Sequence, residues 1–185
     1  EPEVAKPVIT KQPKNVKAKL DKKATFSIKA TGKAVKVQWQ QKKAGTWRNI
    51  KGAKASKLKV TATKSRHGRK YRAVVSNAGG SVTSKVVKLS LKPAKPVIRT
   101  QPRKVTVKAG KKARFSVKVR SYPTAKVRWQ LKRPGSKKWV NIAGARKSKL
   151  TIRARSTMNG YKYRAVVKNK AGQRVSKAVK LTVRR

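Results

Sequence analysis

The sequence predicts an all-β protein made of two similar domains, and three observations lead to this prediction. Apolar residues alternate with basic or polar residues over short segments, which is the period of a half-buried strand. Turn-forming residues separate these segments. Most of the first half recurs in the second half at an offset of 89 to 92 residues. No segment shows sustained apolar spacing of a helix.

The alternation predicts strands in order along the chain. Leu58 and Val60 alternate with Lys57 and Lys59, so that strand has one apolar face and one basic face. The expected strands are residues 24–30, 35–39, 58–62 and 87–91 in the first half and 150–154 in the second. The expected turns are Thr31-Gly32, Ala44-Gly45, His67-Gly68 and Asn77-Ala78-Gly79-Gly80. Short strands joined by such turns favour an antiparallel sandwich.

The internal repeat sets the domain boundaries. The recurring segments are Lys6-Pro7-Val8-Ile9 with Lys95-Pro96-Val97-Ile98, Trp39-Gln40 with Trp129-Gln130, and Tyr71-Arg72-Ala73-Val74-Val75 with Tyr163-Arg164-Ala165-Val166-Val167. We therefore expect one domain over residues 1–92 and a second over residues 93–185. The joint Lys92-Pro93-Ala94-Lys95 is too short for a flexible tether, which predicts a semi-rigid, elongated pair.

The recurring motifs resemble the immunoglobulin-like domain found in tandem in bacterial secreted and surface proteins. Phe26 and Ile28 lie on the segment resembling strand B, Trp39 follows on the segment resembling strand C, and Tyr71 resembles the tyrosine corner before strand F. The equivalents in the second repeat are Phe115, Val117, Trp129 and Tyr163. The resemblance implies two tandem immunoglobulin-like antiparallel β-sandwiches and a location outside the cell, either secreted or on the cell surface.

Two positions depart from the pattern of that family. Where a disulfide would join strands B and F, the sequence has Ile28 with Ala73 and Val117 with Ala165, so burial must hold the core. The turn before the corner tyrosine reads His67-Gly68 or Asn159-Gly160. Our interpretation is that Asn159 tolerates a left-handed backbone there and that His67 tolerates it less well.

The charge composition excludes several classes of function. The chain has 55 Lys and Arg residues against three acids, with 25 basic residues and all three acids in residues 1–92. It has no Cys, which excludes disulfides and thiol chemistry. Glu1, Glu3, Asp21 and the one histidine, His67, are too few and too scattered for acid–base catalysis or metal binding. We expect no enzyme activity, no cofactor, no metal and a surface-loop role for His67.

The same composition favours a partner rich in negative charge. Lys outnumbers Arg by 38 to 17, and lysine acts as a flexible point charge suited to phosphates and sulfates in bulk. The sequence predicts sequence-independent binding of polyanions: nucleic acid backbone, teichoic-acid-like wall polymers, sulfated or uronic glycans, or an anionic membrane surface. The residues expected to bind them are Lys36, Lys57, Lys59, Lys126, Arg128, Lys149, Arg153 and Arg155. For Trp47 and Trp139 we favour a role in covering the core over a sugar-binding platform.

Other hypotheses remain open from the sequence. The chain fits a structural subunit or spacer of a surface stalk or filament, an engineered supercharged scaffold, or an intracellular DNA-compacting protein. The proline-flanked segment Pro7-Val8-Ile9 suggests that an N-terminal strand pairs with another subunit to form a homo-polymer. A start at Glu1 without Met indicates a processed product or a fragment.

Overall fold

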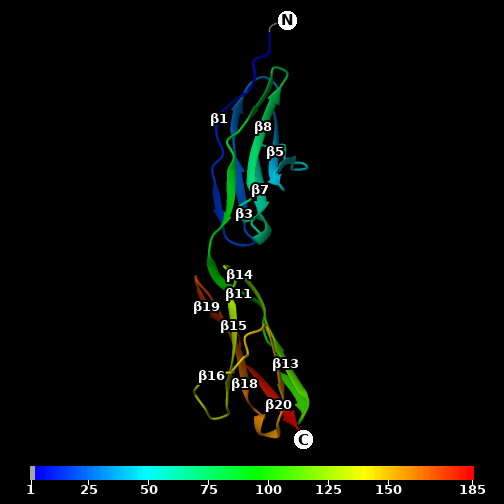
Figure 1. Ribbon diagram of the computed structural model, residues 1–185, viewed down its shortest axis with the longest axis vertical. Coiled ribbons are helices and arrows are strands. Elements are labelled where there is room, and N and C mark those ends of the chain that lie inside the picture. Colours follow the sequence, from blue (N-terminus) through cyan, green and yellow to red (C-terminus); the bar gives the residue numbers. More distant parts are fainter. Residues whose placement is uncertain (1–2) are drawn as a thin grey trace. The chain divides into compact units, whose positions relative to one another are not determined.

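The computed structural model describes residues 3–185, and it confirms the all-β prediction (Figure 1). The chain divides into two compact units, the first ending at Lys92 and the second beginning at Pro93. The described residues contain two short 3-10 helices, η1 (Lys64–Arg66) and η2 (Ser156–Met158), besides the strands. Within residues 3–185, no helix has the length and apolar character needed to cross a bilayer. The predicted elongated arrangement of the two units stays a prediction.

Both domains have the same order of strands. In the first domain these are β1 (Val8–Lys11), β2 (Val16–Ala18), β3 (Lys23–Ser27), β4 (Lys29–Thr31), β5 (Lys36–Lys43), β6 (Thr46–Asn49), β7 (Lys57–Thr61), β8 (Lys70–Asn77), β9 (Gly80–Thr83) and β10 (Val87–Leu91). In the second they are β11 (Ala94–Thr100), β12 (Val105–Lys108), β13 (Lys112–Ser116), β14 (Lys118–Tyr122), β15 (Lys126–Lys132), β16 (Val140–Asn141), β17 (Lys149–Arg153), β18 (Lys162–Asn169), β19 (Gly172–Val175) and β20 (Val179–Arg184).

Two layers form each sandwich. In the first domain, one layer holds the pairs β1–β4 and β3–β7, and the other runs in the order β2-β10-β8-β5-β6 with β9 paired to β8. The second domain repeats this with β11–β14, β13–β17 and β12-β20-β18-β15-β16. One pair in each domain is parallel, β2 with β10 and β12 with β20, whereas the other strand pairs among the described residues are antiparallel, as predicted.

The parallel pair arises because a proline divides the first strand of each domain. Pro13 lies between β1 and β2 and carries no N–H for a sheet hydrogen bond, so the chain leaves one layer and joins the other. Gln12 secures this crossing, because its Oε1 accepts the Lys85 N–H at 2.9 Å. Gln101 accepts the Lys177 N–H at the same distance in the second domain.

The predicted continuous strand over residues 24–30 is also divided. Ile28 donates its N–H to Ser56 O at 3.0 Å, between β3 and β4. This bond ends the pairing of β3 with β7, and β4 then pairs with β1 instead. The two segments still lie in the same layer, and Ile28 points into the core with 3% of its surface exposed.

Aromatic rings fill the centre of each domain. In the first, the Phe26 ring lies 5.0 Å from Tyr71 and 6.4 Å from Trp39, between ring centroids. Trp39 is fully buried, and its Nε1 donates to Ala55 O at 2.9 Å, so the indole N–H keeps a partner. Trp129 makes the equivalent bond to Lys147 O at 2.9 Å. Burial of large rings therefore holds each core together without a disulfide.

A buried serine beside the missing disulfide was not expected from the sequence. Ser84 Oγ accepts the Ala73 N–H at 2.8 Å and donates to Lys85 O at 2.9 Å. Ser176 makes the same two bonds with Ala165 and Lys177 in the second domain. Each hydroxyl satisfies a backbone donor that would otherwise be buried without a partner, where strand β8 or β18 loses its regular neighbour.

The interpretation of the turn before the corner tyrosine is wrong. His67 and Asn159 have φ of −61° and −59°, in extended backbone, and the following Gly68 and Gly160 take the left-handed conformation instead. The two side chains act as hydrogen-bond acceptors. His67 Nδ1 accepts the Leu91 N–H and Asn159 Oδ1 accepts the Val183 N–H, both at 2.9 Å. Histidine is therefore as suitable here as asparagine.

The corner tyrosines are both buried, as the resemblance implies. The Tyr71 hydroxyl has no hydrogen-bond partner among residues 3–185. Burial raises the pKa of Tyr71, while the positive charges of Arg69 and Arg66 act in the opposite direction. Burial, together with Tyr161, raises the pKa of Tyr163 to about 12. Both rings therefore stay neutral in the folded protein near pH 7.

Candidate polyanion-binding surfaces

The structure places the eight predicted binding residues on two separate faces of each domain. All eight are exposed. Lys36, Lys126 and Arg128 lie on β5 and β15, in one layer, whereas the others lie on or just after β7 and β17, in the opposite layer: Lys57, Lys59, Lys149, Arg153 and Arg155. The structure therefore does not gather them into one site. The alternation of the sequence gives the outward direction of each side chain but not which layer a strand joins.

On the outer face of the layer that contains β15 and β18, three lysines form a row across the strands. Lysines lie directly opposite one another on three neighbouring strands: Lys132 on β15 pairs with Lys162 on β18, which pairs with Lys180 on β20. We call these three residues the lysine row. Neighbouring strands are about 4.8 Å apart, and like charges directly opposite each other destabilise a sheet.

The lysine row has no counter-charge within its own domain. Residues 93–185 contain 30 Lys and Arg residues and no acid. In the first domain, Lys70 and Lys88 form a similar opposed pair. Because bound anions would relieve this repulsion, the row is a candidate site for them.

An arginine stacks on a tryptophan in each domain, and in the second domain this stack lies beside the lysine row. Arg164 Cζ lies 4.1 Å from the centroid of the Trp139 ring, and Arg72 Cζ lies 4.3 Å from that of Trp47. Lys132 Nζ is 5.3 Å from the Trp139 ring, which joins this stack to the lysine row. Trp47 and Trp139 are half-buried on the outer face of their sheets. The expectation that they cover the core is therefore corrected: they pack against cations on the outside.

Two side-chain amides fix each stacked guanidinium. Arg164 Nε donates to Gln130 Oε1 at 2.8 Å, and Gln130 Nε2 donates to Asn141 Oδ1 at 3.0 Å. The first domain repeats these bonds at 2.7 and 2.9 Å, with Arg72, Gln40 and Asn49. We call each set of tryptophan, arginine, glutamine and asparagine an indole–guanidinium cluster. Among residues 3–185, the Nη groups of Arg72 and Arg164 donate to no other residue.

The local electrostatics keep these guanidinium groups available for anions. Burial lowers the pKa of the Arg164 guanidinium, but arginine remains charged at any physiological pH. With Nε bonded to Gln130, the Nη atoms present a planar pair of donors in one fixed orientation. A fixed pair of this kind fits two oxygens of a carboxylate, sulfate or phosphate group.

Sequence reasoning did not find the lysine row or the clusters. The signal was present, because Gln40, Trp47, Asn49 and Arg72 all recur in the second half at equivalent positions. What was missing was the register that brings residues from three strands together. The strand containing Trp47 carries little alternation, and Trp139 lies before its strand, so neither ring could be oriented from the pattern.

Two surface hollows lie outside these clusters. One of about 550 Å³ is lined by Gly110, Lys111, Lys112, Arg114 and Arg153, so it includes one predicted residue. Arg153 Nε donates to Gly110 O at 3.1 Å across it. This hollow belongs to the cationic face formed by β13 and β17.

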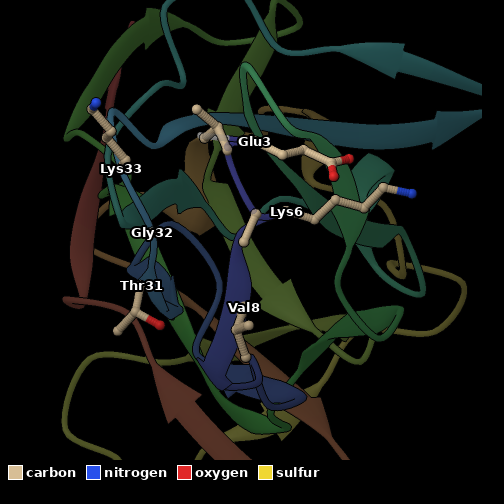
Figure 2. A pocket seen from close by; sticks show the side chains of 8 residues that line it. Glu3, Lys6, Val8, Thr31, Gly32 and Lys33 are labelled. Carbon is tan, nitrogen blue, oxygen red and sulfur yellow. The ribbon is translucent and has the colours of Figure 1, made fainter. Parts of the chain in front are cut away.

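The second hollow, of about 460 Å³, lies next to the N-terminal segment. In Figure 2, Glu3, Lys6 and Val8 line it from that segment, and Thr31, Gly32 and Lys33 line it from the end of β4. Because a carboxylate and an apolar side chain contribute to its wall, this hollow fits a polyanion poorly. Glu1 lies outside the described residues. Within residues 3–185, no three His, Cys, Asp or Glu side chains gather where they could hold a metal.

The topology and the aromatic core define the chain as a pair of immunoglobulin-like domains, in agreement with the resemblance seen in the sequence. Residues 96–183, nearly all of the second domain, match the model of the immunoglobulin I-set domain. Residues 15–93 match a domain of unknown function.

A curated relative places such a pair inside a larger bacterial protein. The chain is 37% identical over 186 residues to Endoglucanase C of Cellulomonas fimi, and the match covers 100% of this chain and 17% of that protein. Among solved structures, it resembles a titin fragment, A168169, with a TM-score of 0.59, 18% identity and coverage of 97% and 100% of the two chains. It also resembles the two domains IG1 and IG2 of DIP-gamma, with a TM-score of 0.51, 19% identity and coverage of 97% and 98%. These two likenesses show the fold alone.

Proposed function

We propose that this chain is a non-enzymatic, exported module that binds anionic polymers through the lysine- and arginine-rich outer faces of its two sandwiches. The observation that carries the proposal is the lysine row, in which three cations face one another across hydrogen-bonded strands of a domain that contains no acid. Such an arrangement costs stability in the isolated protein. A bound polyanion removes that cost.

The binding energy comes from many equivalent contacts. Each lysine that meets a phosphate or sulfate releases a condensed counterion, so affinity falls steeply as salt rises. The predicted residues on β7 and β17 and those on β5 and β15 face opposite sides, which lets a polymer engage either face of a domain. No single lysine is expected to dominate.

The relative supports a role as an accessory part of a longer secreted protein. Endoglucanase C is named as an enzyme, and the chain corresponds to only 17% of its length. In such a setting the module holds the protein to anionic polymers at a surface. We also propose that it lies outside the cell, secreted or surface-attached, because its relative is a bacterial endoglucanase.

The test is a titration of affinity against salt. Binding of the whole chain to duplex DNA and to heparin is measured from low to physiological salt. On duplex DNA, the slope of log K against log salt should be about −0.9 for each phosphate neutralised, which implies a steep line for a chain of this charge. A shallow slope on both polymers would contradict the proposal.

Two matched triple variants locate the contacts. Lys132→Gln, Lys162→Gln and Lys180→Gln remove the lysine row, while Lys112→Gln, Lys118→Gln and Lys149→Gln remove the same charge from the opposite layer of the same domain. We expect the first variant to reduce the slope more, because its lysines are contiguous. Equal reductions would show that binding depends on the number of charges and not on their position.

A second function, as a spacer in a stalk or filament, is favoured by the match to part of a longer protein. It predicts negligible polyanion binding at physiological salt, so the same titration separates the two. Assembly through a donated N-terminal strand requires β1 to leave β4, its partner within the domain. A monomeric mass by light scattering in high salt would remove that form of assembly.

A further inference from the structure

The indole–guanidinium clusters recur with the same geometry although the surrounding chain differs. In the first domain, Trp47 lies within β6, but in the second, Trp139 precedes β16, which has only two residues. The loop before the tryptophan is also longer in the second domain, where it contains Pro134. The two stacking distances nevertheless agree, at 4.3 and 4.1 Å.

This geometry holds each arginine in a defined orientation. The ring restricts the plane of the guanidinium, and the glutamine carbonyl restricts its rotation through Nε. The asparagine in turn orients the glutamine amide. The entropy of a long side chain is thus lost before any ligand arrives, which is the condition for tight binding of a small group.

We propose that each cluster is a built subsite for one carboxylate or sulfate group of an acidic polysaccharide, held by the Nη donors of Arg72 or Arg164. This inference rests on the proposed function and narrows it from any polyanion to one class. In the second domain, Lys132 belongs both to the lysine row and to the surroundings of Trp139, so the row holds the neighbouring acid groups of the same chain.

The chemistry of the clusters favours a glycan over duplex nucleic acid. Gln130, Asn141 and the indole place amide groups and an aromatic edge next to the charge, and these suit sugar hydroxyls and ring carbons. The part of a DNA duplex that a flat β-sheet can reach is mainly its phosphate backbone, and lysine point charges are sufficient to bind it. The fork itself fits a phosphate as well as a sulfate or a carboxylate, so the amides and the indole edge carry the preference for a glycan.

The decisive variant keeps every charge. In the double variant Arg72→Lys with Arg164→Lys, the fork and the bond to glutamine are lost but the net charge stays the same. The control is Arg48→Lys with Arg146→Lys, one exposed arginine in each domain that stacks on no described ring. Affinities of the whole chain are measured by calorimetry at physiological salt for a heparin oligosaccharide, a polygalacturonate oligosaccharide and duplex DNA.

We expect the cluster variant to bind at least one of the two glycans about 10-fold more weakly than the control, with affinity for DNA unchanged. Heparin carries both sulfate and carboxylate groups, so weaker binding of polygalacturonate identifies carboxylate as the bound group, and weaker binding of heparin alone identifies sulfate. An unchanged affinity for both glycans would overturn the subsite, while steep salt dependence would still support the proposed function. An equal loss on DNA would overturn the assignment to a polysaccharide.

A measurement on the unaltered protein covers the case in which the variant does not fold. The Nε–H signals of Arg72 and Arg164 are followed by nuclear magnetic resonance as each glycan oligosaccharide is added. Bidentate binding should shift these two signals ahead of those of Arg48 and Arg146. Shifts spread evenly over all arginine signals would refute the subsite.

Discussion

The hairpin after β8 and the hairpin after β18 have the same fold but are anchored differently. In the first domain, Asn77 Nδ2 donates to Ala5 O at 2.8 Å. In the second, Asn169 Nδ2 donates to Ala94 O at 2.8 Å and also to Pro123 O at 3.0 Å. One asparagine thus ties the second hairpin to two segments. The asparagine of the first hairpin bonds to a single segment, near the N-terminus, and this segment also lies close to Gly79.

That close approach explains a glycine. A Cβ added to Gly79 would overlap the carbonyl oxygen of Val4, whereas the second domain has Ala171 at the same place in the hairpin. The two cores hardly differ: the Phe26–Tyr71 centroids are 5.0 Å apart and the Phe115–Tyr163 centroids 4.7 Å apart. The domains therefore share an interior and differ in how their ends and surfaces are held.

The largest effect should come from removing a central ring in only one domain. Phe26→Ala should destabilise the first domain by about 3–5 kcal/mol, the usual cost of this truncation in a core, which is a large part of the stability of a small domain. Hydrogen exchange should show loss of protection in β3 and β8 while β18 remains protected. Phe115→Ala should give the reverse. Equal loss in both domains after either change would show that the two units do not fold independently.

A smaller effect should separate the two hairpins. Gly79→Ala forces the N-terminal segment away from the hairpin, so we expect faster exchange at residues 4–11 and a cost of about 1–3 kcal/mol. Ala171→Gly, the matched change in the second domain, should cost about 1 kcal/mol or less. If both changes cost the same, the close approach at Val4 is not what requires the glycine.

Alkaline pH should weaken the second domain before the first. The folded second domain holds the Tyr163 proton up to a pKa of about 12, whereas the unfolded chain releases it near the ordinary value of 10.0. Stability from this ring is complete below pH 10 and falls between pH 10 and about 12. In the first domain, the positive charges of Arg69 and Arg66 oppose the rise in the pKa of Tyr71 that burial causes.

The measurement is denaturant unfolding from pH 9 to 12, on the parent chain and on Tyr163→Phe and Tyr71→Phe. Relative to the parent chain, the loss of unfolding free energy between pH 9 and 12 should be reduced more in Tyr163→Phe than in Tyr71→Phe. Charge loss from lysines affects all three proteins alike, so it cancels in the comparison. The opposite order would contradict the difference in environment of the two rings.

The smallest effect should come from exchanging the acceptors of the corner turns. His67→Asn keeps an acceptor for the Leu91 N–H, as Asn159 does for Val183, so we expect a change within about 0.5 kcal/mol. His67→Ala leaves that donor without its acceptor and should cost about 1 kcal/mol. Thermal unfolding of the two variants side by side gives the answer, and a large loss in His67→Asn would assign the turn another role.

The fold could be predicted because its determinants are local or repeated. Alternation around Phe26, Trp39 and Leu58 identified strands, and recurrence identified two domains. The sequence pattern did not show that Pro13 transfers the chain between layers or that Ser84 replaces a sheet partner. Both depend on hydrogen bonds between residues far apart in sequence, such as Gln12 with Lys85.

The outward direction of the basic side chains was predictable from the sequence, but their grouping on the surface was not. Outward lysines such as Lys126 and Lys149 followed from the period of two, and the structure shows them exposed. Their distribution over two layers, and the pairing of Lys132 with Lys162, depend on strand order and register. Neither is encoded in a short window of sequence.

The parallel pairing of β2 with β10, and of β12 with β20, has a mechanical consequence. Each pair joins a strand near the start of a domain to the strand at its end, both running in the same direction. Tension applied through the two ends of the domain slides these strands past each other, so their hydrogen bonds bear the force together instead of opening one at a time. A chain attached at both ends to larger structures would resist a pulling force through these parallel strand pairs.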